Sequence, residues 1–388
     1  MISMSAQERQ RRLDLVDMHT MPHEALVGLV KETAAESEQF KNDSANYARN
    51  STKALQLMKN NNLIKSLDLS TIELKSSTLP YTVGIDGSNQ PRPTPDGYML
   101  YFFSAVRINF EPGNIDPKIY YAGHTRRIRS TVEESAGKQA ELFMTGMETK
   151  ELRQVTSEKQ PNEDGKYTDS LVFMDGPIIE PPFDNDSTNI KERSRALKLA
   201  IEKNIIPIGI IKRVYSQFFI DRYAGLFNVA AEQNCFKALN HDKNFAIYVL
   251  TKFLENSENI GYTQPFKFSD IADMDKYIKP VKQYYAEGID VLTFLMSNGF
   301  SGNPIRVDVA IPADKPFDVD VFTKQIVTYI AQWSAPGRHV PIPVTLAHDQ
   351  CNIRQGTANI LYSDYITGSK TGDVLQDVTA HKMLEETH

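Results

Sequence analysis

The sequence contains few cysteines and no long apolar run. Cys235 and Cys351 are the only cysteines among 388 residues, and they form no C-x-x-C pair. Neither a zinc site nor a disulfide framework is therefore indicated, and we expect two reduced, buried thiols. No stretch approaches the roughly 18 to 20 apolar residues of a membrane-spanning helix, and the charged start, MISMSAQERQRRLDLVDM, is unlike an apolar signal peptide. We expect a cytoplasmic protein without membrane contact.

An excess of positive charge is also absent. Lys and Arg number 43 against 49 Asp and Glu, which gives a formal net charge of -6, whereas dedicated nucleic-acid-binding domains are usually strongly basic. A local basic stripe, or a channel between subunits, can still contact DNA. The candidates, for which a solvated edge is the alternative, are His124, Arg126, Arg127 and Arg129, and the pair Lys212 and Arg213.

The pattern of apolar residues divides the chain into four segments. With 41% apolar and 10% aromatic residues, the chain can bury a substantial core. Residues 1–78 have apolar positions at helical spacing and predict a helical N-terminal segment. Residues 79–214 are predicted to form the first part of the core, and residues 300–388 to complete it. Residues 215–299 are rich in aromatics and helical spacings, which predicts a mostly helical insertion or cap.

The core segment predicts an α/β fold with a mixed sheet flanked by helices. Three strand-like runs occur between residues 79 and 128, and the short turn EPGNIDP makes the last two an antiparallel hairpin. A helix follows, for which Ser130 or Thr131 is a plausible N-cap. LVFMDGPII and IIPIGIIKR then flank another helix, a spacing that implies a crossover and parallel pairing. Near the C-terminus, a strand and a helix precede an extended segment that enters a final helix.

Two aspartates each follow an apolar run and precede a glycine. Asp86 lies in VGIDGS and Asp175 in LVFMDGP, so each is predicted at a strand end, before a turn. Either one alone is most simply a turn residue. If the two strands are neighbours in one sheet, however, both carboxylates converge at one edge, where they can hold divalent metal ions for phosphodiester hydrolysis. The order of these segments is typical of RNase H-like nucleases.

A third carboxylate is expected from the helix between the two aspartates. The choice lies among Glu133, Glu134 and Glu141, and each residue advances about 100° around the helix axis. If the apolar positions from 132 to 147 form the buried face, Glu133 lies roughly 60° from its centre and the other two point away. Glu133 is therefore favoured as a metal ligand, and a capping box that begins at Ser130 is the alternative.

Two further side chains can contribute chemistry. Lys212 ends the run IIPIGIIKR, where an ammonium group can hold a phosphate oxygen or stabilise the transition state. His348, in LAHDQ, can supply a fourth metal ligand or transfer a proton. The alternatives are a solvated lysine and a structural histidine beside Asp349, which could cap a helix.

Together, VGIDGS, the R-x-x-x-E of residues 129–133, LVFMDGP, IGIIKR and LAHD resemble the NurA family of nucleases in order and spacing, over roughly residues 80 to 360. The resemblance implies an RNase H-like core with 5′ to 3′ exonuclease and single-strand endonuclease activity on DNA. It implies Mn²⁺, with Mg²⁺ possible and two ions per site. A homodimer and a HerA-type hexameric ATPase partner are also implied, in DNA end processing or antiviral defence. The residues that match the family's site are Asp86, Glu133, Asp175, Lys212 and His348.

Two rival functions remain open from the sequence. The first is an RNase H-like endonuclease with the same metal chemistry and another substrate preference. The second is a catalytically idle scaffold that binds an ATPase through its N-terminal helices and its aromatic middle segment. Three carboxylates in one constellation count against the scaffold.

Overall fold

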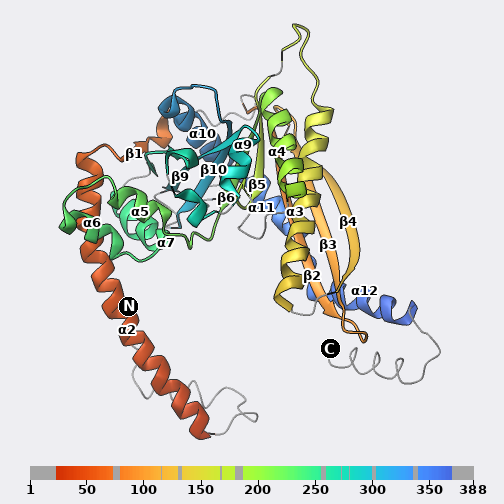
Figure 1. The fold of residues 1–388 in the computed structure, drawn as a ribbon, viewed down its shortest axis with the longest axis horizontal. Coiled ribbons are helices and arrows are strands. Elements are labelled where there is room, and N and C mark those ends of the chain that lie inside the picture. The colour runs from red at the N-terminus through yellow and green to blue at the C-terminus, as the bar shows by residue number, and fades with distance from the viewer. Residues whose placement is uncertain are drawn as a thin grey trace.

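The computed structural model describes residues 23–72, 79–114, 116–129, 133–166, 168–179, 187–254, 259–271, 273–278, 280–298, 303–334 and 340–368. Within these ranges, helices surround one ten-stranded mixed sheet (Figure 1). Its main path runs in the order β1-β7-β9-β10-β6-β5-β2-β3-β4, and β8 pairs with β9 beside that path. The strands are β1 (Ile64–Leu67), β2 (Tyr81–Pro93), β3 (Met99–Phe110), β4 (Lys118–Ile128), β5 (Ser170–Asp175), β6 (Ile205–Ile211), β7 (Ile260–Thr263), β8 (Phe266–Lys267), β9 (Ile289–Asn298) and β10 (Ile305–Pro312).

The half of the sheet from β4 to β6 has the predicted RNase H-like arrangement. Strands β2, β3 and β4 pair antiparallel, and the turn EPGNIDP joins the last two as a hairpin. Strand β5 pairs parallel with β2, and β6 parallel with β5, across the crossover helix α4 (Ser187–Glu202). The prediction of a mixed α/β sheet flanked by helices is confirmed.

The other half of the sheet corrects two predictions. Residues 215–299 contain more helix than strand, as predicted, but they are not separate from the core, because β9 is an interior strand between β7 and β10 of the main sheet. The N-terminal segment is not helical throughout either, since Ile64–Leu67 forms edge strand β1. Strand β1 is set by pairing with the distant β7, whereas β9 pairs mainly with β10, the next strand along the chain.

Helices pack on both faces of the sheet. They are α2 (His23–Asn60), α3 (Glu133–Glu158), α4, α5 (Phe218–Ala224), α6 (Ala230–Lys237), α7 (Asp242–Phe245), α8 (Thr251–Phe253), α9 (Val281–Ala286), α10 (Val319–Trp333), α11 (Ile342–Cys351) and α12 (Gln355–Gly368), with short 3₁₀ or π turns η1 (Leu69–Thr71), η3 (Ala246–Leu250), η4 (Phe268–Asp270) and η5 (Met274–Lys276). Strand β5 shows why both faces are covered. Its residues Leu171 and Phe173 join one apolar core with α10 and α11, whereas Val172 and Met174 join another with α3 and α4. A strand buried on both faces reads as a continuous apolar run.

The C-terminal part differs from its prediction in one respect that concerns the site. Residues 342–351 form helix α11 rather than an extended segment, and α11 packs against β2 and β3. His348 therefore lies within a helix, and Asp349 follows it in that helix rather than capping its start. Pro341 precedes the helix and Pro343 lies in its first turn, where proline is tolerated because the first helical N–H groups have no partner within the helix.

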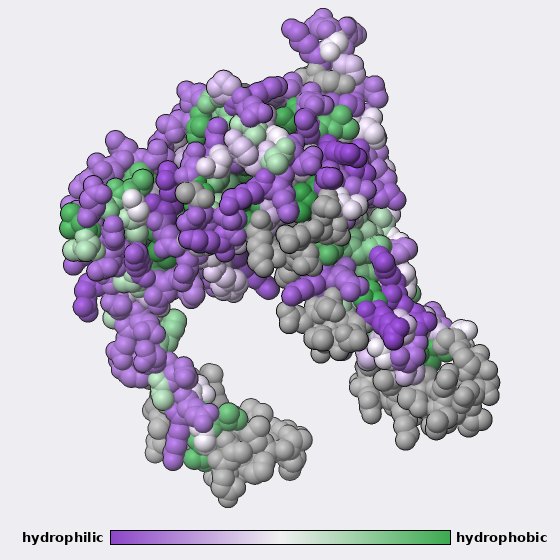
Figure 2. All heavy atoms as spheres, in the orientation of Figure 1, coloured by the Kyte–Doolittle hydropathy of each residue, from purple (hydrophilic) through white to green (hydrophobic). Residues whose placement is uncertain are grey.

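Helix α2 projects away from the body, and its C-terminal part packs on α6 (Figure 1). Its N-terminal half is largely exposed, and hydrophilic side chains predominate over the projecting part on the face shown in Figure 2. No helix in the described ranges is long and apolar enough to cross a membrane.

Candidate metal centre

The two predicted aspartates lie side by side in the sheet. Strands β2 and β5 pair in parallel with Ile85 opposite Met174, so Asp86 and Asp175 are the next residues along the two strands. Asp175 ends β5 as predicted, and Gly176 follows with φ +129°, a backbone conformation that favours glycine. Asp86 does not end its strand, because β2 continues to Pro93. The glycine after Asp86 therefore has a role other than a turn.

His348 completes a group of three possible ligands. Its Nδ1 lies 2.9 Å from Oδ2 of Asp86 and 3.2 Å from Oδ2 of Asp175. Helix α11 carries the ring to this position because Gly84 of β2 lacks a side chain. A Cβ there would lie 2.1 Å from the carbonyl oxygen of Pro343, so only glycine allows the helix this close to the strand.

The centre concentrates negative charge in a partly buried place. Asp86 is only 5% exposed, and its carboxylate accepts hydrogen bonds from the N–H of Gly87 at 2.7 Å and from the thiol of Cys351 at 3.3 Å. Burial, and next the charge of Asp175, raise the pKa of Asp86 to about 6. Burial and the neighbouring carboxylates also raise the pKa of Cys351, so its thiol remains a neutral donor.

Lys212 supplies one compensating charge. It follows the end of β6, and its Nζ donates to Oδ2 of Asp175 at 2.6 Å. The neighbouring Arg213 is exposed. Lys212 is thus beside the two aspartates, as the sequence predicts, whereas no contact connects Arg213 to them in the described residues.

The donor set fits a divalent metal ion. Ligand atoms of Asp86, Asp175 and His348 all lie within 4.8 Å of one another, and in the described ranges no other group of three acidic, histidine or cysteine side chains is this close. Carboxylate oxygens with one imidazole nitrogen suit Mn²⁺, and carboxylates also suit Mg²⁺. The side chain of His348 is 52% exposed, which leaves the centre open to substrate and solvent.

Glu148 of α3 lies against β2 at Gly87, next to Asp86 in the strand, but outside the group that Asp86, Asp175 and His348 form. At Gly87 a Cβ would lie 2.8 Å from Cγ of Met144 and 2.9 Å from Oε1 of Glu148. Gly87 therefore lets α3 press against β2, directly beside Asp86. Glu148 also acts on the site electrostatically, because its charge contributes to the raised pKa of Cys351.

The predicted ligand Glu133 lies at the other end of the helix. It is the first residue of α3, and fifteen residues separate it from Glu148, which is about 22 Å along the axis. Its side chain, that of Glu134 and the predicted caps Ser130 and Thr131 lie outside the described residues. The assignment of Glu133 as a ligand therefore stays a prediction.

Glu148 and Arg193 lie next to the centre, and the sequence alone did not single them out. Glu148 lies four residues before the buried Leu152 and eight after the buried Ala140, so extending the apolar face beyond Met147 would have indicated it. Arg193 carries no comparable local signal, since an arginine in an amphipathic helix is usually exposed.

Arg193 contacts both the turn that follows Asp175 and the part of α3 that contains Glu148. This residue of α4 is 3% exposed, and its guanidinium donates to the carbonyls of Ile178 at 2.9 Å and Pro177 at 3.4 Å, and to Oγ1 of Thr149 at 3.2 Å. The carbonyls belong to the turn that follows Asp175, and Thr149 is next to Glu148. Arg193 is thus a positioning residue for both carboxylates.

Replacing Arg193 with Met should lower the free energy of unfolding by about 2 to 3 kcal/mol, because buried acceptors lose a charged donor. Urea denaturation of the full chain measures this loss. The matched control is Arg195→Met, on the exposed side of the same helix, which should stay within about 0.5 kcal/mol of the wild type. Equal losses in both variants would contradict the positioning role.

The structure divides the predicted basic stripe between two faces of strand β4. Arg127 pairs with Asp96 and lies 4.5 Å over the ring of Tyr98, and Arg129 lies 5.9 Å from the same ring. His124 and Arg126 instead contact Phe143 of α3. Successive side chains of a strand point to opposite faces, so the four residues cannot act as one surface.

Comparisons with known proteins concern most of the chain. The NurA domain model matches residues 81–353. The chain is structurally similar to a crystal structure of NurA bound to dAMP and manganese (TM-score 0.39, 12% identity, 87% of this chain and 94% of that chain covered) and to one of NurA with manganese (0.41, 11%, 88% and 97%). It is also similar to the catalytic domain of human Endonuclease V (0.29, 11%, 81% and 94%). Among curated proteins, none is significantly similar to the chain.

Proposed function

This chain belongs to the NurA family of nucleases, and we propose that it is a metal-dependent deoxyribonuclease that hydrolyses phosphodiester bonds. One observation carries the proposal. The carboxylates of Asp86 and Asp175 and the imidazole of His348 converge within 4.8 Å at the carboxyl end of β5. A catalytically idle scaffold gains nothing from two adjacent carboxylates, one of which, Asp86, has its pKa raised by burial and next by the charge of the other.

The proposed cofactor is Mn²⁺, with Mg²⁺ as a substitute and two ions per site. Asp86, Asp175 and His348 would hold the metal, and Glu148, rather than Glu133, would provide the carboxylate from α3. When bound, divalent ions make water nucleophilic near neutral pH and stabilise charge on the phosphate. The excess negative charge of the carboxylates favours such binding.

The remaining roles belong to side chains of the chain itself. Lys212 holds the orientation of Asp175 through its 2.6 Å hydrogen bond, and its ammonium can also bind a phosphate oxygen. The thiol of Cys351 and the N–H of Gly87 orient the carboxylate of Asp86. His348 contacts both aspartates and solvent, so it can hold a proton or a metal at this edge of the sheet.

We further propose the finer activities that the family resemblance implies. These are 5′ to 3′ exonuclease and single-strand endonuclease cleavage of DNA, as a homodimer, with a HerA-type hexameric ATPase as translocase. End processing in repair and destruction of invading DNA both require this chemistry. A translocase that delivers DNA reduces the need for high intrinsic affinity, which suits a chain with a net charge of -6.

A cleavage assay on end-labelled DNA tests the proposal. The full chain is incubated with Mn²⁺, Mg²⁺ or EDTA, with and without a HerA-type ATPase, on linear duplexes, single-stranded circles and RNA. We expect cleavage of DNA with Mn²⁺, weaker cleavage with Mg²⁺ and none with EDTA. Asp175→Asn should be inactive, whereas Asp349→Asn, an exposed neighbour of His348, should be active. Absence of both cleavage and Mn²⁺ binding by calorimetry would revive the idle scaffold.

A further inference from the structure

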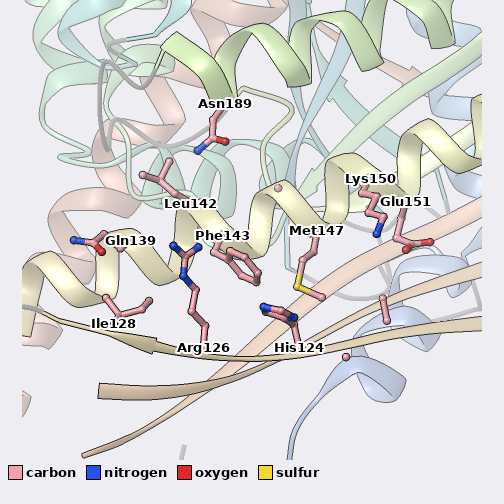
Figure 3. Close-up of a pocket in the computed structure, with 13 residues that line it drawn as sticks. His124, Arg126, Ile128, Gln139, Leu142, Phe143, Met147, Lys150, Glu151 and Asn189 are labelled. Atoms are coloured by element: carbon pink, nitrogen blue, oxygen red, sulfur yellow. The ribbon is translucent and has the colours of Figure 1, made fainter. Parts of the chain in front are cut away.

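A hollow lies along α3, apart from the metal centre. Its volume is about 580 Å³, and it is bounded by α3, strand β4 and the first turn of α4 (Figure 3). We call it the α3–β4 hollow. Six of the side chains that line it could contact a ligand: His124, Arg126, Gln139, Phe143, Lys150 and Asn189.

Phe143 forms the centre of a stacking platform. The imidazole of His124 stacks on its ring with centroids 5.0 Å apart and planes 28° from parallel. The guanidinium of Arg126 lies 5.1 Å from the centroid of the same ring. In Figure 3, His124 and Arg126 rise from β4 on either side of the phenyl group. Aromatic rings flanked by cations are a general means of binding nucleobases, whose flat faces stack without regard to sequence.

The charged groups of the hollow favour an anion. His124, Arg126 and Lys150 are exposed. The acidic residue in the lining, Glu151, is buried and lies 3.5 Å from the guanidinium of Arg107, which also pairs with Glu158 at 2.6 Å. The amides of Gln139 and Asn189 lie at the margin of the hollow, where amide groups can pair with base edges.

The hollow and the metal centre share one helix. Met144 and Glu148 press against β2 at Gly87, whereas Phe143 and Met147, on the adjoining face of α3, line the hollow. In the sheet, His124 pairs with Phe103, which in turn pairs with Asn89 of β2, three residues beyond Asp86. Two strand spacings and three residues amount to roughly 14 Å in the plane of the sheet. The hollow lies on the α3 face and the side chain of Asp86 on the α11 face, so a DNA strand bound at both would have to pass from one face of the sheet to the other.

We propose that the α3–β4 hollow binds a nucleotide of single-stranded DNA, with its base stacked on Phe143 and its phosphate bound by Arg126 and Lys150. This inference rests on the proposed nuclease function, because it places the flanking strand of the same substrate. A single strand is required, since a base in a duplex keeps both its faces covered by neighbouring bases. The hollow would hold the strand and would not touch the reacting phosphate.

The test compares two double variants, each of which replaces one arginine of β4 and the aromatic ring that this arginine contacts, on opposite faces of β4. The double variant Arg126→Gln, Phe143→Leu removes the platform and keeps an apolar side chain on α3. The control, Arg127→Gln, Tyr98→Leu, removes the equivalent arginine and ring on the other face. Anisotropy of fluorescein-labelled dT12 in EDTA measures binding by the full chain. Bis(p-nitrophenyl) phosphate, which is too small to reach the hollow, reports the metal centre.

We expect the double variant to bind dT12 about 10-fold more weakly and to hydrolyse the small phosphodiester at the wild-type rate, with the control unchanged in both. The single variant Arg126→Gln, at an exposed position, should lower the slope of log affinity against log salt by about 0.7. Unchanged dT12 binding by the double variant would overturn the proposal, and so would an equal loss of binding by the control. The same holds if the double variant has an altered sedimentation coefficient and still binds dT12 as the wild type does. If the wild type hydrolyses neither substrate, the nuclease function fails, and the binding comparison still decides the hollow.

Discussion

Replacing Asp86 with Asn should abolish DNA cleavage and also stabilise the metal-free protein at pH 7.5. Loss of a metal ligand removes several kcal/mol of transition-state stabilisation, a decrease in rate of about 10³-fold or more. The gain in stability has an electrostatic cause. In the folded protein, burial and then the charge of Asp175 raise the pKa of Asp86 to about 6, from its usual 3.8. That difference destabilises the ionised folded state by about 3 kcal/mol.

The sign of this effect sets its pH dependence. Because the folded pKa is the higher one, the carboxyl imposes no penalty below pH 3.8, and the penalty grows until the pH exceeds about 6. Urea denaturation in EDTA should therefore show a larger advantage of the Asn variant at pH 7.5 than at pH 5. Adding Mn²⁺ should stabilise the wild type more than the variant. A variant less stable than the wild type at pH 7.5 in EDTA would contradict the electrostatic account.

The convergence of the two aspartates was predictable, because each belongs to an apolar strand and the strand order allowed the strands to be neighbours. The role of Gly87 was not. In the sequence, Asp-Gly reads as a turn, but β2 continues through it for six further residues, to Pro93. What Gly87 provides is space for Met144 and Glu148. Only the position of α3, which is set by tertiary packing, shows that Gly87 leaves space for a helix and does not form a turn.

Other errors share a physical cause. Strand β1 gains its ladder hydrogen bonds from β7, about 200 residues further along the chain, which its own four residues do not specify. Strand β9 carries a nearly continuous apolar run, Val291 to Met296, which is also compatible with a buried helix segment. His348 was expected after an extended segment, but two prolines at the start of α11 are compatible with a first helical turn. The sequence therefore indicated His348 as a candidate ligand, but not the secondary structure that carries it.

The second large effect should come from Glu148. Glu148→Gln keeps the size of the side chain and its packing against β2, and removes only the charge. If this carboxylate completes the centre, cleavage of DNA with Mn²⁺ should fall about 100-fold or more, because one carboxylate ligand supplies at least about 3 kcal/mol to the transition state. Calorimetry should also show weaker Mn²⁺ binding.

Glu133→Gln is the matched control for this variant. The two glutamates belong to one helix, about 22 Å apart along its axis, so loss of the charge at position 133 should leave activity and Mn²⁺ affinity within about twofold of the wild type. Gly87→Ala supplies independent evidence, since its Cβ would lie 2.9 Å from Oε1 of Glu148. Displacing that carboxylate should lower the cleavage rate while Asp86 and Asp175 are intact. An inactive Glu133→Gln beside an active Glu148→Gln would instead make Glu133 the ligand and require α3 to lie differently on the sheet.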